Sequence, residues 1–169
     1  MKRGAGSRPV APGRRVPGLK DLGALVRFHE KIYWKEYRYD RRFGAYVAKG
    51  LADMVLRYDS ARDRLWLEKR GGRIIGSVAI VHRSRTSAQL RWFLVAPDHR
   101  GKGMGNRLMR QALRFARRAG YRAVFLWTTS ELDAARRVYE GAGFRKSAQR
   151  THDAWGRRNV TEERYAIRL

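Results

Sequence analysis

The sequence contains no cysteine, few acidic residues and no long hydrophobic run. Without cysteine the chain has no disulfide, no thiolate-bound metal and no cysteine nucleophile. No apolar stretch approaches the roughly 20 residues needed to cross a bilayer, so we expect a soluble protein with no membrane contact, located in the cytoplasm. The four histidines lie far apart in the sequence, without the spacing of metal ligands. We therefore expect no metal site.

Acidic residues are scarce beside basic ones. The chain has 15 Asp and Glu against 39 Lys and Arg, which gives a formal net charge of +24. Such a surplus favours an anionic partner, because a phosphate-rich cofactor occupies only a few cations, and RNA or ribosome contact is one interpretation. A genomic preference for arginine on solvated surfaces explains the same composition, so both interpretations stay open.

The length of 169 residues predicts one folded domain. Residues 1–18 hold three of the four prolines, four glycines and five Lys or Arg, with no acidic residue. This composition predicts a disordered basic tail. Residues 19–169 then form the domain, whose oligomeric state, including a homodimer, is left open.

Hydrophobic spacing predicts two helices at the start of the domain. The first begins at Leu19, and the second has apolar core-facing positions that include Tyr46 and ends near Tyr58. Two strands around Gly71-Gly72 follow as a hairpin, and a further strand runs from Gln89 to Val95.

The second half of the chain alternates helices and strands. A glycine-rich segment opens a helix to about Ala119, and residues 123–127 form a continuous apolar run typical of a buried strand. A helix from about Leu132 to Gly141 precedes two closing strands, 144–152 and 161–169, around a Trp155-Gly156 loop. This order implies an α/β protein with a mixed sheet.

The clearest chemical signal is Arg100-Gly101-Lys102-Gly103-Met104-Gly105. It follows a strand and opens a helix, where unpaired backbone N–H groups and the helix dipole favour a phosphate. Gly103 and Gly105 let the backbone approach a pyrophosphate, while Arg100 and Lys102 add positive charge. The spacing matches neither the nucleotide P-loop nor the complete Rossmann fingerprint.

Arg-x-x-Gly-x-Gly after a strand ending in Phe93-Leu94-Val95 resembles the acetyl-CoA motif of the GNAT N-acetyltransferases. A second motif, Val138 to Phe144, follows in the order of that family, and the resemblance covers 19–169. Leu126 to Thr129, Trp155-Gly156 and Glu162 to Tyr165 look like the acetyltransferase half of MarR-GNAT fusion proteins. The resemblance implies the GNAT fold, a central and mostly antiparallel sheet flanked by helices, with acetyl-CoA as co-substrate.

The resemblance also implies roles for single residues. The backbone of Phe93, Leu94 and Val95 would pair with the pantetheine arm, and that of Gly101 to Gly105 would hold the pyrophosphate. Tyr139 sits where the family often places a phenol near the cofactor sulfur, so it is the candidate general acid, with core packing as the other interpretation.

One position departs from the family pattern. Many members carry Asn seven residues before the tyrosine, where this chain has Leu132. Ser130 could replace that cofactor contact or cap the following helix.

The acceptor and the base are less well defined. The carboxylates considered as a base are those of Glu36, Asp40, Glu68, Glu131 and Asp133, and a water chain is the alternative. Core packing explains the aromatic candidates for an acceptor pocket equally well. These substrate-binding candidates are His29, Tyr33, Glu36, Tyr37, Trp92, Trp127 and Trp155.

Arginines recur at three- and four-residue steps along the helix after the glycine motif, as a basic stripe of Arg107, Arg110, Arg114, Arg117 and Arg118. Three functions remain. The favoured one is direct acetyl transfer from acetyl-CoA to a primary amine of a small molecule or amino acid. The second is acetylation of a macromolecule such as aminoacyl-tRNA or a ribosomal protein. The third is a nonenzymatic nucleic-acid-binding module, which the intact glycine motif opposes.

Overall fold

The computed structural model describes residues 18–169. The disordered tail expected over 1–18 lies, apart from Gly18, outside the described residues. Within them, four α-helices and six strands alternate largely as the sequence predicts. In chain order the elements are α1 (Leu19–Tyr37), α2 (Arg41–Leu56), β1 (Arg64–Arg70), β2 (Arg73–His82), β3 (Ser87–Val95), a short 3-10 helix (Pro97–His99), α3 (Met104–Arg118), β4 (Ala123–Thr129), α4 (Asp133–Gly141), β5 (Arg145–Ala154) and β6 (Arg157–Arg168).

The six strands form one sheet in the order β1-β2-β3-β4-β6-β5. Only β3 and β4 run parallel, and the other four neighbouring pairs are antiparallel. The predicted mixed, mostly antiparallel sheet is confirmed. The closing strands are longer than expected: β6 begins at Arg157, so the Trp155-Gly156 segment is a tight turn between two paired strands.

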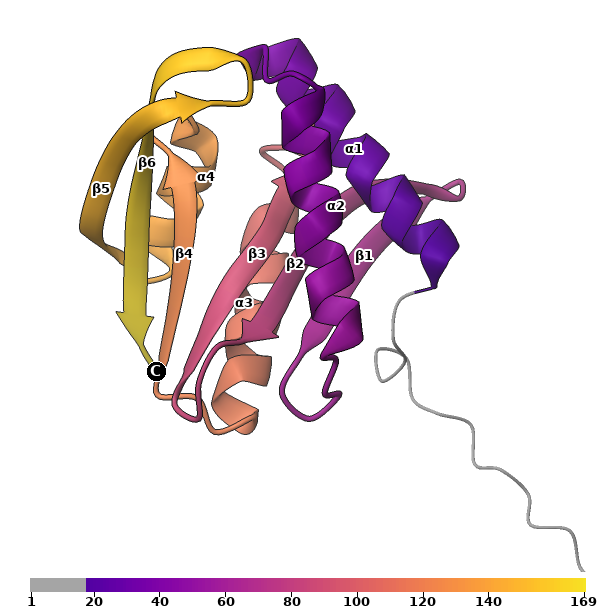
Figure 1. Cartoon of the computed structure of the whole chain (residues 1–169). Helices are drawn as coiled ribbons and strands as arrows, with labels where there is room; N and C mark the ends of the chain where they lie inside the picture. Colours follow the sequence, from indigo (N-terminus) through magenta and orange to yellow (C-terminus); the bar gives the residue numbers. More distant parts are fainter. Residues whose placement is uncertain (1–17) are drawn as a thin grey trace, which may run out of the picture.

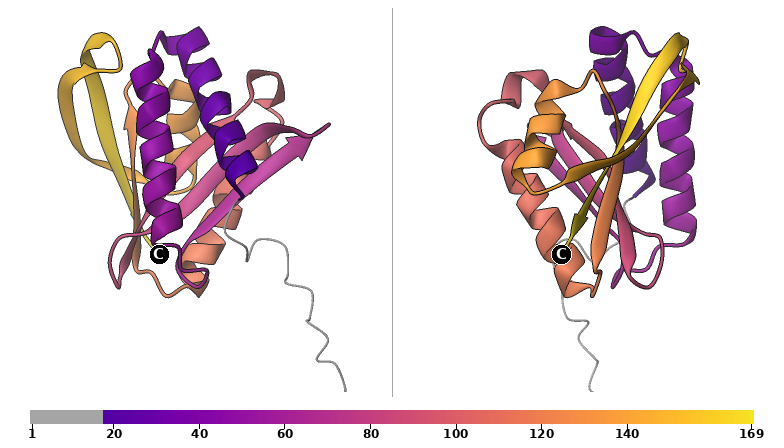
Figure 2. Two further views of the ribbon diagram at one scale, coloured as in Figure 1. Left: turned by 45° about the vertical axis from the view of Figure 1, so that its right-hand side comes forward. Right: turned by 90° about the vertical axis from the view of Figure 1, so that its left-hand side faces the viewer.

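Helices cover both faces of the sheet, α1 and α2 on one and α3 and α4 on the other (Figures 1 and 2). Successive β2 residues therefore belong to two cores, as the period of a strand requires. Val78 and Ile80 pack under α3, whereas Ala79 and Val81 pack under α1 and α2. Within the described part of the chain, no helix has the length and hydropathy to cross a membrane.

Capping residues mark the end of α1 and the beginning of α2. Arg38 adopts a left-handed conformation (φ 60°) that stops α1, and the Asp40 side chain accepts a hydrogen bond from the Arg42 backbone N–H at 3.0 Å to begin α2.

The expectation that Tyr46 faces the core is wrong, since 45% of the residue is exposed. Its ring instead packs against Trp155 from the β5–β6 turn.

A β-bulge interrupts β3 at Trp92. The register with β2 slips between Ser77, which pairs with Leu94, and Ala79, which pairs with Arg91, and Trp92 has a φ of +48°. Because a bulge inserts one extra residue, the side-chain alternation shifts at this point. Arg91 and Trp92 consequently lie on the same face of the sheet, towards α2, where Trp92 joins the core.

Candidate active site

The parallel pairing of β3 with β4 is short. It covers only Ser87 to Gln89 on β3, after which the strands separate, as Figure 1 shows for their upper ends. The Ala96 N–H donates to Ile75 of β2, so by strand alternation the amides of Phe93 and Val95 face the open edge. The carbonyl of Val95 confirms this direction, because it accepts from Arg100 Nε at 3.0 Å.

The glycine motif is the turn that follows this open edge. Gly101 (φ +71°) and Gly103 (φ +79°) are left-handed, a conformation that other residues adopt only under strain, and Gly103 is the N-cap of α3. The first helical hydrogen bond runs from the Arg107 N–H to the Gly103 carbonyl at 3.0 Å. The amides of Met104 to Asn106 therefore lack intrahelical acceptors and stay available to an anion.

The two cations expected at this turn are both engaged elsewhere. The Arg100 guanidinium binds both carboxylate oxygens of Glu36, at 2.9 and 3.0 Å, and Lys102 Nζ donates to the Asp98 carbonyl at 2.7 Å. Glu36 balances the charge of Arg100, whereas Lys102 bonds to a neutral carbonyl and keeps its positive charge at the turn, so their role as cations at the mouth stays a prediction. Arg100 also holds the end of α1 against the end of β3, which shapes the wall of the site.

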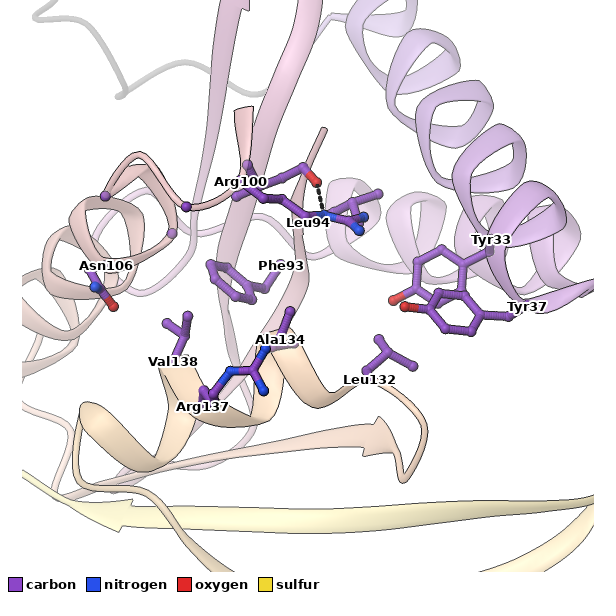
Figure 3. A pocket seen from close by; sticks show the side chains of 15 residues that line it. Tyr33, Tyr37, Phe93, Leu94, Arg100, Asn106, Leu132, Ala134, Arg137 and Val138 are labelled. Atoms are coloured by element: carbon purple, nitrogen blue, oxygen red, sulfur yellow. Dashed lines mark hydrogen bonds between the residues drawn. The ribbon is translucent and has the colours of Figure 1, made fainter. Parts of the chain in front are cut away.

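The open edge and the glycine turn enclose a cavity of about 360 Å³, the large cavity. That volume falls in the range of roughly 300 to 1,000 Å³ typical of small-molecule sites. Figure 3 shows side chains from four elements around it: Phe93 on β3, Asn106 on α3, Val138 on α4 and the hydroxyls of Tyr33 and Tyr37 on α1. The remaining lining residues are Leu94, Val95, Arg100, Gly101, Gly103, Gly105, Leu132, Ala134, Ala135 and Arg137.

Gly105 lines the large cavity, and its surroundings leave room for a side-chain methyl group in ordinary van der Waals contact. A Cβ there would lie 3.4 Å from the Phe93 ring and 3.6 Å from Val138. Three other expected cofactor residues do not line the cavity: Lys102, Met104 and Ser130. The Met104 side chain packs into the core under β2, and Ser130 is not the cap of α4, because Leu132 occupies that position without a side-chain bond.

Arg137 is a lining residue that sequence reasoning missed. It is exposed and makes no ion pair within residues 18–169, unlike its neighbour Arg136, which binds Asp133. The spacing along α4 could have predicted this position. Arg137 lies three residues after Ala134 and one before Val138, and all three line the cavity.

A second cavity of about 90 Å³, the small cavity, lies between the sheet and the first two helices. Tyr33, Phe93 and Leu132 line both cavities, so the two adjoin at these residues. Five of the seven substrate-binding candidates line the small cavity: His29, Tyr33, Trp92, Trp127 and Trp155. Of the other two, Tyr37 lines the large cavity, whereas Glu36 lines neither cavity and is bound to Arg100.

The β5–β6 turn closes the outer end of the small cavity. The Trp155 carbonyl accepts from the Asp40 N–H at 2.9 Å, and the Trp155 ring packs against Tyr39 and Phe43. A Cβ at Gly156 would approach the Asp40 carboxylate to 2.7 Å, so this contact requires glycine.

Tyr139 lies at the bottom of the small cavity and is 4% exposed. Its ring contacts Phe93, Phe144 and Tyr165. Burial raises the pKa of its hydroxyl, against a smaller opposite effect of Thr128, so the hydroxyl keeps its proton at neutral pH. Tyr139 therefore packs in the core and also lines the small cavity, and its role as general acid stays a prediction.

His29 is neutral in this setting. It is 3% exposed, and burial lowers its pKa to about 4. Its Nδ1 lies 3.1 Å from the Leu25 carbonyl, which can only accept, so Nδ1 carries the proton and Nε2 carries the lone pair. Nε2 has no hydrogen-bond partner in residues 18–169.

None of the five carboxylates considered as a base lines either cavity. Each is engaged by a cation: Glu36 by Arg100, Asp40 by Arg42, Glu68 by Arg107, Glu131 by Arg157 and Asp133 by Arg136. Glu162 on β6, which the sequence did not single out as a base, is buried and lines the small cavity. Its carboxylate is bound by Arg150 and His152, each at 2.7 Å.

The basic stripe along α3 also requires one correction. Arg107 is paired with Glu68 of β1 at 2.8 Å, so the stripe is not free of acids. The other four arginines are exposed and form no ion pair within the described residues: Arg110, Arg114, Arg117 and Arg118.

Comparison with known proteins identifies relatives for this arrangement. The model of the acetyltransferase (GNAT) family matches residues 27–144. N-acetyltransferase 8F1 of Rattus norvegicus is 33% identical over 131 residues, which cover 75% of this chain and 57% of that protein. The chain thus spans little more than half the length of this curated relative.

Solved structures share the fold at low sequence identity. An acetyltransferase from Streptococcus agalactiae superposes with a TM-score of 0.73 at 20% identity, covering 90% of this chain and 94% of that one. A Salmonella typhimurium protein solved with its cofactor acetyl-CoA superposes with a TM-score of 0.69 at 19% identity, covering 92% of both chains.

Proposed function

The chain belongs to the acetyltransferase (GNAT) family, and we propose that it transfers the acetyl group of acetyl-CoA to a primary amine of a small molecule. The observation that carries this proposal is the continuity of the large cavity. A strand edge leads into a glycine turn along one wall of a single cavity, and the amides of both have no partner in the described part of the chain. An extended ligand with amide groups at one end and phosphates at the other matches that sequence of donors.

The residues present fit acetyl-CoA along its length. The amides of Phe93 and Val95 would pair with the pantetheine arm, and Gly101 to Asn106 would surround the pyrophosphate, in a turn whose left-handed conformation at Gly103 favours glycine. Arg137 at the edge of the cavity would contribute charge to the phosphates. Acetyl-CoA supplies an acetyl group activated as a thioester.

The proposed reaction forms an amide N–C bond and breaks the thioester C–S bond. The amine loses one proton, and the sulfur gains one. Tyr139 holds a proton on its hydroxyl that it can give to the sulfur and recover from water, and its raised pKa keeps that proton in place until it is needed. Phe93 and Tyr33 border both cavities, so the acceptor amine would meet the thioester beside them.

The size of the small cavity favours a small acceptor. At about 90 Å³ it holds much less than the sites of drug-sized ligands, which begin near 300 Å³. A macromolecular acceptor such as aminoacyl-tRNA or a ribosomal protein would have to present one amine there and bind outside it. The exposed α3 arginines would be the RNA-binding surface in that case.

The narrower resemblance to the acetyltransferase half of MarR-GNAT fusion proteins stays a hypothesis about ancestry. It rests on Leu126 to Thr129, Trp155-Gly156 and Glu162 to Tyr165. A location in the cytoplasm and assembly as a homodimer are likewise proposals.

Acetyl-CoA binding by calorimetry, followed by thiol release with a panel of amines and amino acids, tests the proposed function. We expect saturable binding and acceptor-dependent thiol release. Parallel reactions with charged tRNA and ribosomal protein separate the macromolecular alternative. Thiol release confined to those acceptors would contradict the small-molecule proposal, and binding of RNA without any acetyl-CoA binding would contradict an acetyltransferase altogether.

A further inference from the structure

One cation in the small cavity has no anionic partner. Arg91 lines this cavity, and its guanidinium makes no hydrogen bond or ion pair with any residue from 18 to 169. It lies instead over the rings of Trp92, at 4.7 Å, and Tyr46, at 5.5 Å. Stacking uses the face of a guanidinium and leaves its in-plane N–H donors for an anion.

Two backbone features hold Arg91 in this position. The bulge at Trp92 turns Arg91 and Trp92 towards the same face, and Gly50 on α2 leaves room for the guanidinium. A Cβ at Gly50 would come within 2.8 Å of Arg91 Nη2 and 2.9 Å of Nη1. The guanidinium is therefore packed tightly between α2 and the sheet rather than extended into solvent.

The surroundings of Arg91 are positively charged. The pKa of Arg83 is lowered by burial and by the neighbouring charges of Arg91 and Arg57. Asp53 lies close enough to Arg91 to feel its charge but is bound by Lys49 at 2.8 Å. An anion beside Arg91 would relieve repulsion among these arginines.

The small cavity also contains unpartnered groups of both hydrogen-bonding types. Trp92 is 7% exposed, and neither its Nε1–H donor nor the acceptor His29 Nε2 finds a hydrogen-bond partner among residues 18–169. Buried polar groups normally have partners. A ligand that brings an acceptor to Trp92 and a donor towards His29 would complete both.

We propose that the acceptor is an amino acid whose carboxylate binds Arg91, with the Trp92 indole as a second donor, and whose amine lies at Phe93. This inference rests on the proposed function, because it names the acceptor of that reaction. Phe93 is two residues beyond Arg91, which is at most about 7 Å along the strand, because the bulge at Trp92 shortens the rise. A short amino acid, joined to Arg91 by a hydrogen bond of about 2.9 Å, spans that distance.

The test compares each amino acid with the amine that lacks only its carboxylate: alanine with ethylamine, leucine with isoamylamine, phenylalanine with phenethylamine. The wild-type protein should acetylate the better amino acids with a kcat/KM at least about tenfold above that of the matched amine. Arg91→Gln should raise KM for the amino acid until that preference is lost, and it should change the kcat/KM of the matched amine much less.

A second pair of variants tests the packing of Arg91 without removing its charge. Gly50→Ala should displace the guanidinium and weaken the carboxylate preference. Gly23→Ala, on α1, is the matched control, because its Cβ would approach only Arg27 Nη1, at 3.4 Å. Acetyl-CoA affinity and thermal melting show that each variant is folded.

A binding measurement gives a readout apart from turnover. In the presence of CoA, the N-acetylated amino acid should bind more tightly to the wild type than to Arg91→Gln, with no such difference for the N-acetylated amine. Equal use of acid and amine by the wild type, or a preference retained in Arg91→Gln, would overturn the inference and leave the proposed function standing. Acetyl-CoA binding with no thiol release from any acceptor would overturn both.

Discussion

The two cavities of this protein are built in different ways. One wall of the large cavity is backbone: a strand edge that, beyond Gln89, pairs with no strand among the described residues, and a glycine turn whose amides open α3. The small cavity is bounded by side chains, mostly aromatic, from α1, α2, β3, β4 and the β5–β6 turn. Backbone donors recognise any ligand with the right spacing of acceptors, whereas side chains from several elements select shape and charge. The large cavity therefore suits a ligand common to a family, and the small cavity suits one particular to this chain.

The largest expected effect tests whether the large cavity depends on its glycine turn. Gly103→Glu should weaken acetyl-CoA binding on the order of 100-fold or more, because a negative side chain would lie at the amides that receive phosphate. Gly120→Glu is the control, since Gly120 has the same φ of +79° and open surroundings at the far end of α3. Calorimetry measures both affinities. Similar affinities in the two variants would show that the pyrophosphate does not bind at this turn.

The second prediction concerns Tyr139, the candidate general acid, which lines the small cavity. Tyr139→Phe should lower kcat on the order of 100-fold while acetyl-CoA affinity stays unchanged, because the ring remains and only the proton donor is lost. Tyr165→Phe removes another buried hydroxyl from the same cluster, one that donates to Glu163. Steady-state kinetics should separate the variants. Full turnover by Tyr139→Phe would leave this tyrosine with a packing role only.

The third prediction concerns stability and the buried histidine of the small cavity. The pKa of His29 falls from 6.5 in the unfolded chain to about 4 in the folded one, so below pH 6.5 the unfolded state takes up the proton first. Stability from this group is complete above pH 6.5 and is lost as pH falls towards 4. Between pH 7 and pH 5 we expect a loss of about 2 kcal/mol in the free energy of unfolding.

Urea unfolding of the wild type and His29→Gln at both pH values measures that loss. Subtracting the pH dependence of the variant removes the contribution of the other titrating groups. A variant with the same dependence as the wild type would show that His29 titrates normally.

The smallest effect tests whether side-chain charge matters in the large cavity. Arg137→Ala should raise the Kd of acetyl-CoA about three- to fivefold, and the difference should shrink in high salt, because exposed charge pairs are weak and screened. Arg136→Ala is the neighbouring control, since Arg136 binds Asp133 and does not line the cavity. A larger effect of Arg136→Ala would mean that the orientation of α4, rather than charge, governs binding.

The order of helices and strands and the place of the glycine turn followed from the sequence, because both depend on neighbours in the chain. Hydrophobic period, glycine positions and caps such as Asp40 act over a few residues. Phe93 to Val95 and Gly101 to Gly105 were predicted together for that reason, and they lie along one cavity wall or in its turn. A motif that resembles a known family also singled out Tyr139, which lines the small cavity.

Only the tertiary structure decided the partners of charged side chains. Arg100 binds Glu36, 64 residues away in the sequence, and Glu131 binds Arg157, 26 residues away. Arg100 and Glu131 are therefore not the free charges that their positions in the sequence suggested. Arg91 shows the opposite case. It is an ordinary strand arginine in the sequence, but a bulge and a glycine on α2 place it where no anion from residues 18–169 pairs with it. Local patterns determine which elements form, but the distance between side chains far apart in sequence depends on how those elements pack.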